Sequence, residues 1–348
     1  MTGSLIDATV EHVLERWEDL LPGVARPHRL RVLKTGGSRP AGGKITLHLL
    51  ADGARLPSVI VKLPRDKVAE AAIGREAAGL ARCARVLSQS LRAALPLPAH
   101  LAAIQGRPAV VTAFRRGRSL RWLCPPVRKG WRGRLLAGAS AAMEWLASFH
   151  RETRTGGARA DNIAAPLRDP RLRERMSATG VAPLEAAIAA VAQTGEAPIA
   201  MTHGDFVPEN VLWDQGGIAI VDWEWSQAEG PALADTLMFP TALALLLDPT
   251  RRATLETRVA AYRAAFFHTG WFAEAWRGLL ARYCEATATE TRLLPAVYPA
   301  VLASMATRDE RTVGLASGTD QLFQAVLTAY LSESETNRAR LWPGAAGA

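Results

Sequence analysis

The chain has 348 residues, of which 49% are hydrophobic and 22% charged, and its formal net charge is +9. This length can hold two lobes with sizeable cores, and the composition is that of an ordinary soluble globular protein. The longest apolar stretch, residues 236–247, contains Pro240 and is too short to cross a bilayer, which excludes a transmembrane segment. Three scattered cysteines without metal-binding spacing favour a reducing, cytoplasmic location.

The first third of the chain predicts a small α+β lobe. Residues 1–23 place apolar side chains on one face of a helix and lack the basic region of a signal peptide, so they predict a docking helix. A second helix is predicted around Glu76 from apolar residues at helical spacing. Apolar and β-branched runs predict strands at 29–34, 44–50, 57–63, 98–104 and 108–114.

A lysine within the third predicted strand is a candidate for binding phosphates. Only five of the 42 basic residues are lysines, and Lys62 lies in the apolar run 58–64, where a charge needs a partner. A compact ammonium suits a point contact with phosphate groups. Glu76 is the expected helical partner, and Glu70 is the competing candidate. The alternative is that Lys62 points to solvent at the end of its strand.

Two further segments could hold a nucleotide. The glycine-rich stretch 35–43 would let backbone N–H groups approach phosphate, with Ser38 as a contact, although an ordinary hairpin turn has the same composition. The run 108–117 is a β-branched strand with a polar break, which fits a hinge whose backbone at Thr112 to Phe114 bonds adenine. The valines that would either sandwich adenine or belong to the strand core are Val59, Val61 and Val110.

A basic segment precedes the second, helical part of the chain. Residues 115–134 contain eight basic residues, no acid and two tryptophans, Trp122 and Trp131. A solvated basic surface is the plain interpretation, and an anionic substrate, an acidic membrane or a nucleic acid are the functional alternatives. Among these we favour an anionic or uncharged substrate. Beyond it, helices are predicted at 135–151 and 183–193 and through Tyr262, Trp276, Tyr283 and Leu322.

The most informative segment is 201–222, with the sequence MTHGDFVPENVLWDQGGIAIVD. Four residues separate Asp205 from Asn210. At this interval one loop can place a catalytic-base carboxylate beside the γ-phosphate of ATP and an amide oxygen on Mg²⁺. The apolar run 217–221 then ends in Asp222, a second hard oxygen ligand of the kind that Mg²⁺ prefers. The pattern indicates phosphoryl transfer.

With His203, the DWE element that begins at Asp222, and Asp235 in GPALAD, this segment resembles the aminoglycoside phosphotransferase and choline kinase family. That family has the signature HGDxxxxN, then DWE or DFE, then GxPxxD. The resemblance implies an α+β, bilobal, protein-kinase-like fold. It also implies that His203 and Asp235 brace the catalytic loop by hydrogen bonds. His203 is grouped with Asp205 as a catalytic residue. Glu224 could face either substrate or solvent.

The implied layout has three parts. A nucleotide-binding lobe with an antiparallel sheet covers residues 1–114, and a larger, mainly helical catalytic and substrate-binding lobe covers 115–340. The last residues, 341–348, are expected to form a disordered tail.

The predicted activity is transfer of the γ-phosphoryl group of ATP, or of GTP, to a hydroxyl of a small molecule with Mg²⁺. Residues 241–348 hold eleven arginines and ten acids, so they lack the acidic surplus that a polycationic aminoglycoside would need. Choline would need an aromatic cage, and the aromatic residues of 271–298 are more typical of a core. The alternatives are a catalytically silent nucleotide-binding or regulatory protein, an aminoglycoside phosphotransferase proper, and a nucleic-acid binder, of which the last is not expected.

Overall fold

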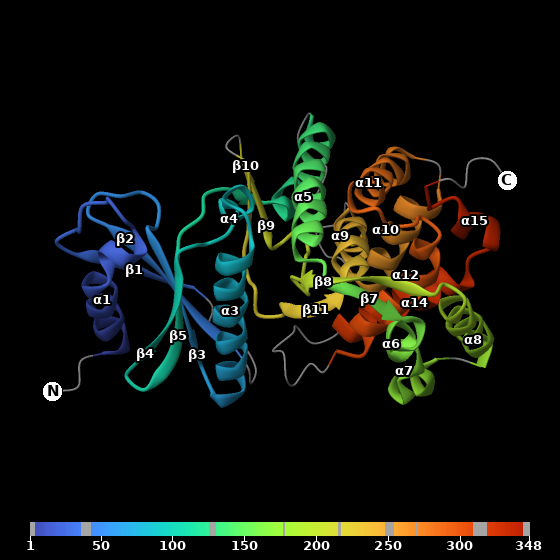
Figure 1. Ribbon diagram of the computed structural model, residues 1–348, viewed down its shortest axis with the longest axis horizontal. Helices are drawn as coiled ribbons and strands as arrows, with labels where there is room; N and C mark the ends of the chain where they lie inside the picture. The colour runs from blue at the N-terminus through green and yellow to red at the C-terminus, as the bar shows by residue number, and fades with distance from the viewer. Residues whose placement is uncertain are drawn as a thin grey trace. The chain divides into compact units, whose positions relative to one another are not determined.

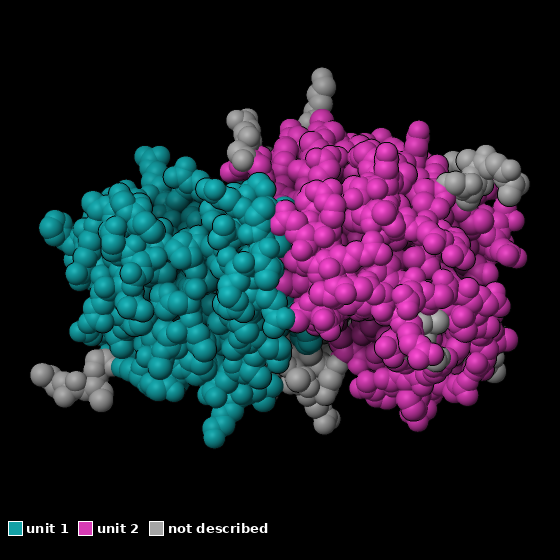
Figure 2. All heavy atoms as spheres, viewed as in Figure 1, with its two compact units in different colours: residues 1–117, 219–226, 309–315 teal, residues 118–218, 227–308, 316–348 magenta. Residues whose placement is uncertain are grey.

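The computed structural model describes residues 4–35, 43–124, 130–176, 178–214, 217–247, 254–268, 270–308 and 319–343. The described chain forms two compact units (Figure 2). Unit 1 contains the chain up to Gly117 together with the segment Ala219–Ser226, and unit 2 contains the remaining described residues from Arg118 onward. Ser38, proposed from the sequence as a phosphate contact, lies outside the described residues.

Unit 1 is built on a five-stranded antiparallel sheet with the order β1-β2-β3-β5-β4 (Figure 1). The sheet carries α1 on one face and α3 on the other. The strands are β1 (Leu30–Thr35), β2 (Lys44–Ala51), β3 (Val59–Pro64), β4 (Ala99–Ile104) and β5 (Arg107–Ala113). The helices are α1 (Leu5–Glu15), α2 (Trp17–Leu20), α3 (Lys67–Val86) and α4 (Gln89–Arg92). All five strands and both longer helices coincide with segments predicted from the sequence.

The two faces of this sheet differ because successive side chains of a strand point to opposite sides. Val59 and Val61 are fully buried in a core that includes Trp17, on the side of α1. Lys62 therefore points to the other face, toward α3. Val110 lies directly opposite Lys62 in the strand register and packs against residues of α3. Of the two alternatives that the sequence left for these valines, the structure supports the strand core for Val59 and Val61.

Unit 2 is mainly helical and contains short antiparallel strands. β7 (Gly156–Arg159), β8 (Glu196–Thr202) and β11 (Gln227–Pro231) form a sheet with β8 in the centre. β6 (Arg118–Ser119) pairs with β9 (Val211–Asp214), and β10 (Gly217–Ile220) leads out of unit 2 into the segment Ala219–Ser226. The sheet of β7, β8 and β11 was not predicted, because β7 (GGAR) and β11 (QAEGP) lack the apolar residues that mark a strand in a sequence.

The longer helices of unit 2 pack on this sheet or on one another. They are α5 (Trp131–Thr153), α8 (Ala178–Ala192), α9 (Ala232–Leu246), α10 (Leu255–Phe267), α11 (Trp271–Thr287), α12 (Leu293–Ala306) and α14 (Thr319–Ser332). The short ones are η1 (Leu120–Leu123), α6 (Ala160–Ala164), η2 (Ala165–Arg168), α7 (Pro170–Arg175) and α15 (Glu335–Ala339). Within the described ranges, no helix combines the length and apolar character needed to cross a membrane.

The C-terminal part of unit 2 is more ordered than the sequence suggested. Leu341 and Trp342 were expected to begin a disordered tail, but both side chains are buried. Residues 344–348 of that tail lie outside the described residues. The aromatic residues considered for a choline cage also belong largely to the interior, since Phe272, Trp276 and Tyr298 are buried.

Candidate active site

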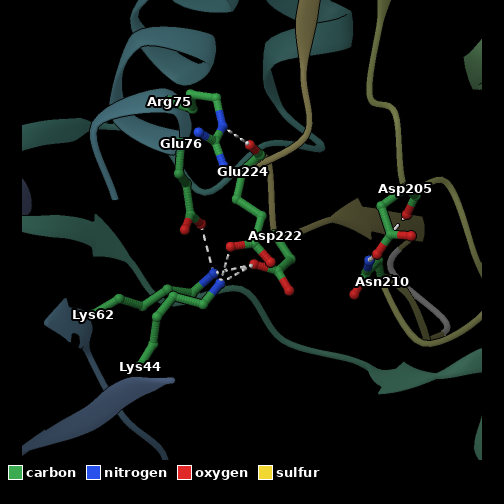
Figure 3. A network of polar contacts seen from close by, with 8 residues as sticks. All are labelled: Lys44, Lys62, Arg75, Glu76, Asp205, Asn210, Asp222 and Glu224. Atoms are coloured by element: carbon green, nitrogen blue, oxygen red, sulfur yellow. Dashed lines mark hydrogen bonds and ion pairs between the residues drawn. The ribbon is translucent and has the colours of Figure 1, made fainter. Parts of the chain in front are cut away.

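Five charged side chains of unit 1 form one polar cluster (Figure 3), made of Lys44, Lys62, Glu76, Asp222 and Glu224. Lys62 Nζ lies 2.6 Å from Glu76 Oε1 and 2.7 Å from Asp222 Oδ1. Lys44 Nζ lies 2.5 Å from Glu224 Oε2 and 3.3 Å from Asp222 Oδ1. Asp222 is therefore shared by both lysines. We refer to these five residues as the Lys62 cluster.

The strands and helix of unit 1 explain why these side chains meet. Lys62 pairs with Thr46 across β2 and β3, and Lys44 lies two residues before Thr46, so both lysines point to the same face of the sheet. Glu76 belongs to the buried side of α3, the helix packed on that face, and it is 1% exposed. Glu70, the competing candidate, is an exposed residue of the same helix.

The segment Ala219–Ser226 is fixed by the burial of one side chain and by two contacts with α3. The indole of Trp223 is fully buried, and Arg75 Nε donates a 3.0 Å hydrogen bond to the carbonyl of Glu224. Gly79 lets the helix approach closely, because a side chain at this position would collide with Ser226. These contacts hold the backbone from which Asp222 and Glu224 extend toward the lysines.

Asp222 has an unusual backbone conformation. Its φ is +68°, in the left-handed region that non-glycine residues seldom adopt. A residue held in such a region costs on the order of 1–3 kcal/mol, and residues of this kind cluster at functional sites. The conformation directs a carboxylate at two ammonium groups, and the contacts of the segment with α3 keep it in place.

Burial and charge act in opposite directions on the Lys62 cluster. Burial alone would lower the pKa of Lys62, but the carboxylates of Asp222 and Glu76 raise it well above its usual value. For Lys44 as well, burial lowers the pKa, and the net rise comes mainly from Asp222. Burial raises the pKa values of Glu76 and Glu224, and the negative charge of Asp222 adds to the rise of both. Both lysines therefore remain charged.

In unit 2, the loop that follows β8 is fixed by Asp235. The carboxylate of Asp235, in the first turn of α9, accepts the N–H of His203 at 2.7 Å and that of Gly204 at 2.9 Å. Gly204 has a φ of +75°, which a residue with a side chain would rarely adopt. His203 is fully buried, and its Nδ1 accepts the N–H of Asp205 at 3.3 Å. The buried carboxylate of Asp235 thus fixes the backbone of the loop from which the side chain of Asp205 extends.

Within this loop Asp205 and Asn210 contact each other directly. Asn210 Nδ2 donates to Asp205 Oδ2 at 2.9 Å and to the carbonyl of Asp205 at 3.0 Å. The amide nitrogen is used in this way, so the amide oxygen is the atom with which Asn210 could bind a metal. Asp205 Oδ1 lies 3.6 Å from Arg308 Nη1. The loop therefore presents a partly exposed carboxylate beside an amide and a guanidinium.

A buried histidine supports Asp235 from behind. His150 of α5 lies with Nε2 3.7 Å from Asp235 Oδ2, and its Nδ1 lies 2.7 Å from the hydroxyl of Tyr283. Burial alone would raise the pKa of Asp235, but His150 and His203 lower it below its usual value. Asp235 is therefore ionised in the folded protein at neutral pH.

Replacing Asp235 by Asn is expected to lower the free energy of unfolding by about 3 kcal/mol at pH 7, because the backbone of His203 and Gly204 loses a charged acceptor. The pKa of Asp235 is depressed in the folded state, so its stabilisation is complete above the unfolded value of about 4 and disappears as the pH falls through the folded value. Urea unfolding of both proteins from pH 7 downward measures this. Glu274→Gln, at an exposed position of α11, is the control. A difference between Asp235→Asn and the native protein that stays constant with pH would contradict the role of the charge.

The predicted hinge uses its amides within the sheet. Thr112 lies in β5 between Ile60 of β3 and Ala99 of β4. The N–H of Phe114 donates to the carbonyl of Ser58 at 3.0 Å. The Phe114 amide that was expected to meet adenine is therefore already hydrogen-bonded inside unit 1.

The basic segment 115–134 is partly used in structural contacts. Arg115 donates to two backbone carbonyls of unit 1, those of Leu95 and Leu97. Arg121 lies 3.4 Å from Glu209 of the Asp205 loop in unit 2. Trp122 is 78% exposed, and residues 125–129 lie outside the described residues. A ligand-binding role of this segment stays a prediction.

Two charged residues at these sites were missed from the sequence. Lys44 could have been found, because it is one of five lysines and begins a predicted strand adjacent to that of Lys62. No comparable sequence feature marks Arg308, because it is one of many arginines and lies 103 positions after its partner Asp205.

Comparisons with known proteins identify a family and a fold. A sequence model described as the phosphotransferase enzyme family matches residues 41–280. The crystal structure of aminoglycoside phosphotransferase APH(4)-Ia is 14% identical, has a TM-score of 0.53, and the match covers 94% of this chain and 100% of that chain. A thermostable mutant of the same enzyme, in ternary complex with ADP and hygromycin B, is 13% identical with a TM-score of 0.52, over 94% and 100% of the two chains.

Glucosamine kinase in complex with glucosamine, ADP and inorganic phosphate is 19% identical with a TM-score of 0.49, over 94% of this chain and 85% of that one. No curated protein sequence matches the chain significantly. The likeness to the APH(4)-Ia structures confirms the predicted α+β, protein-kinase-like fold.

Proposed function

The chain belongs to the phosphotransferase enzyme family, and from this premise we propose that it transfers the γ-phosphoryl group of ATP to a hydroxyl of a small molecule. The observation that carries the proposal is the pairing of Lys62 with a buried glutamate and with Asp222. A strand lysine, a helical glutamate and an aspartate that can bind a metal are the parts with which kinase-like enzymes hold a nucleotide. GTP is the alternative donor.

Each residue has a distinct task in the proposed reaction. Lys62, steadied by Glu76, contacts the phosphates of ATP, and Lys44 supplies a second ammonium from the same face of the sheet. Asp205 orients the acceptor hydroxyl and receives its proton as the oxygen attacks the γ-phosphorus. The bond from that phosphorus to the leaving oxygen then breaks, and its electron pair departs with ADP. Asn210 holds the carboxylate of Asp205 in position.

The residues present fit a magnesium ion. The carboxylate of Asp222 and the amide oxygen of Asn210 are hard oxygen donors, and Mg²⁺ is usually held by one or two such groups together with phosphate oxygens and waters. We propose these two residues as its ligands. When bound, the ion neutralises charge on the phosphates of the nucleotide. The nucleotide base would meet the backbone after Phe114, because the amide of Phe114 is engaged in the sheet.

We propose an uncharged or anionic acceptor rather than a polycation. The guanidinium of Arg308 lies 3.6 Å from the carboxylate of Asp205, so a positive charge already adjoins the group that would receive the hydroxyl. An acceptor with an ammonium next to its reactive hydroxyl would be repelled there. The nearly balanced charge of residues 241–348 also argues against a polycationic acceptor.

A phosphate-transfer screen over sugars, polyols, hydroxy acids and amino alcohols tests the proposal, with mass gain of one phosphoryl group as the readout. We expect Mg²⁺-dependent turnover that is faster for glucose-type acceptors than for their amino counterparts, such as glucosamine. Tight ATP binding without turnover across the panel would favour the catalytically silent alternative. Salt-sensitive retention on DNA or RNA would favour a nucleic-acid binder.

A further inference from the structure

Arg308 makes two contacts with the loop that carries Asp205. It follows the C-terminal end of α12 in unit 2, and its Nη1 lies 3.6 Å from Asp205 Oδ1. Its Nη2 donates a hydrogen bond to the carbonyl oxygen of Gly204. The side chains of Arg308 and Asp205 are 18% and 23% exposed. One guanidinium therefore reaches both the carboxylate and the backbone of the residue before it.

These contacts complement those made by Asn210 and Asp235. Asn210 bonds one carboxylate oxygen of Asp205, and Arg308 faces the other. Asp235 accepts the N–H of Gly204, and Arg308 donates to its carbonyl. Rotation of the carboxylate would separate at least one oxygen from its partner. A hydrogen bond from Asn210 on one side and the positive charge of Arg308 on the other therefore both act on the orientation of Asp205.

A guanidinium suits this position for an electrostatic reason. In the proposed reaction Asp205 operates near a triphosphate, whose negative charge repels the carboxylate and would turn it away. Arginine keeps its charge at every working pH and can contact a carboxylate and a carbonyl with one planar group. If Arg308 only tied the end of α12 to the loop, the bond to Gly204 would be enough. The second contact is with the group that the proposed reaction uses.

We infer that Arg308 is a positioning residue that fixes the orientation of the Asp205 carboxylate toward the acceptor hydroxyl. The inference rests on the proposed function, because it assigns Arg308 a role through Asp205. It extends that function, since this arginine lies outside the HGDFVPEN segment and outside the residues matched by the family.

Steady-state kinetics of Arg308→Met, with ATP and the best acceptor of the screen, test the inference. We expect kcat to fall by about 10- to 100-fold, the scale of a misplaced reacting group, while KM for ATP stays within about twofold. Arg308→Lys should retain more activity than Arg308→Met, because lysine restores the positive charge, although it lacks the planar guanidinium that contacts two groups at once. Millimolar guanidinium should restore part of the kcat of Arg308→Ala. Arg263→Met, which removes an arginine 3.6 Å from Glu333, is the matched control with unchanged kcat.

Thermal unfolding of each variant separates positioning from folding. A loss of activity that parallels a loss of folded protein, without rescue by guanidinium or by lysine, would overturn the inference. An unchanged kcat of a folded Arg308→Met would overturn it as well, while leaving the proposed function intact. Absence of turnover by the native protein on every acceptor would instead reject the proposed function and the inference together.

Discussion

Replacing Asp205 by Asn is expected to lower kcat by about 10²- to 10⁴-fold, the usual contribution of a positioned general base, with little change in the affinity for ATP. The asparagine keeps the shape of the side chain but neither accepts a proton nor pairs with Arg308. Nucleotide binding should survive, because the Lys62 cluster belongs to unit 1 and contains no atom of Asp205. Single-turnover kinetics and ATP titration measure the two effects separately.

Glu209→Gln is the matched control for Asp205→Asn. Glu209 lies in the same HGDFVPEN segment and contacts Arg121, and its side chain is 36% exposed against 23% for Asp205. It should retain most of the native kcat. Equal losses in both variants would mean that the loop, rather than the carboxylate of Asp205, is sensitive to substitution. A selective rise in KM for ATP in Asp205→Asn would place Asp205 in nucleotide binding instead.

The sequence could predict the parts of the site that depend on local spacing. Asp205 and Asn210 are five positions apart, so one turn of the loop suffices to bring them together, and the structure shows the hydrogen bond between them. The strands and the helix of unit 1 follow from apolar periodicity, which is why Lys62 and Glu76 could be placed on neighbouring elements.

Contacts that depend on register and on packing between distant segments could not be read from the sequence. The orientation of Val59 depends on which face of β3 the docking helix covers, and a strand pattern alone leaves both faces equivalent. Glu224 was ambiguous because its partner, Lys44, comes from 180 positions earlier in the chain. The contact of Arg308 with Asp205 could not be predicted for the same reason. Pairs between residues far apart in the chain leave no local pattern.

Asp222→Asn is expected to abolish Mg²⁺-dependent ATP binding and to lower turnover by about 10³-fold or more, comparable to the loss of a group that stabilises charge in the transition state. The variant removes a proposed metal ligand and the carboxylate that both Lys44 and Lys62 contact. Asparagine is among the residues that tolerate a positive φ, so the backbone at +68° should be preserved and the effect should come from the charge. Calorimetric titration with ATP, with and without Mg²⁺, measures the loss.

Glu224→Gln distinguishes this effect from general disturbance of the Lys62 cluster. It removes one partner of Lys44 but leaves Asp222 between the two lysines, so Mg²⁺-dependent binding should persist with a smaller loss. If Glu224→Gln and Asp222→Asn were equally damaging, the ion pairs of the cluster rather than a metal ligand would govern nucleotide binding. If Asp222→Asn bound ATP with Mg²⁺ like the native protein, Asp222 would not be a ligand. The strained backbone would then serve the two lysines alone, because their ammonium groups need a buried counter-charge even without a nucleotide.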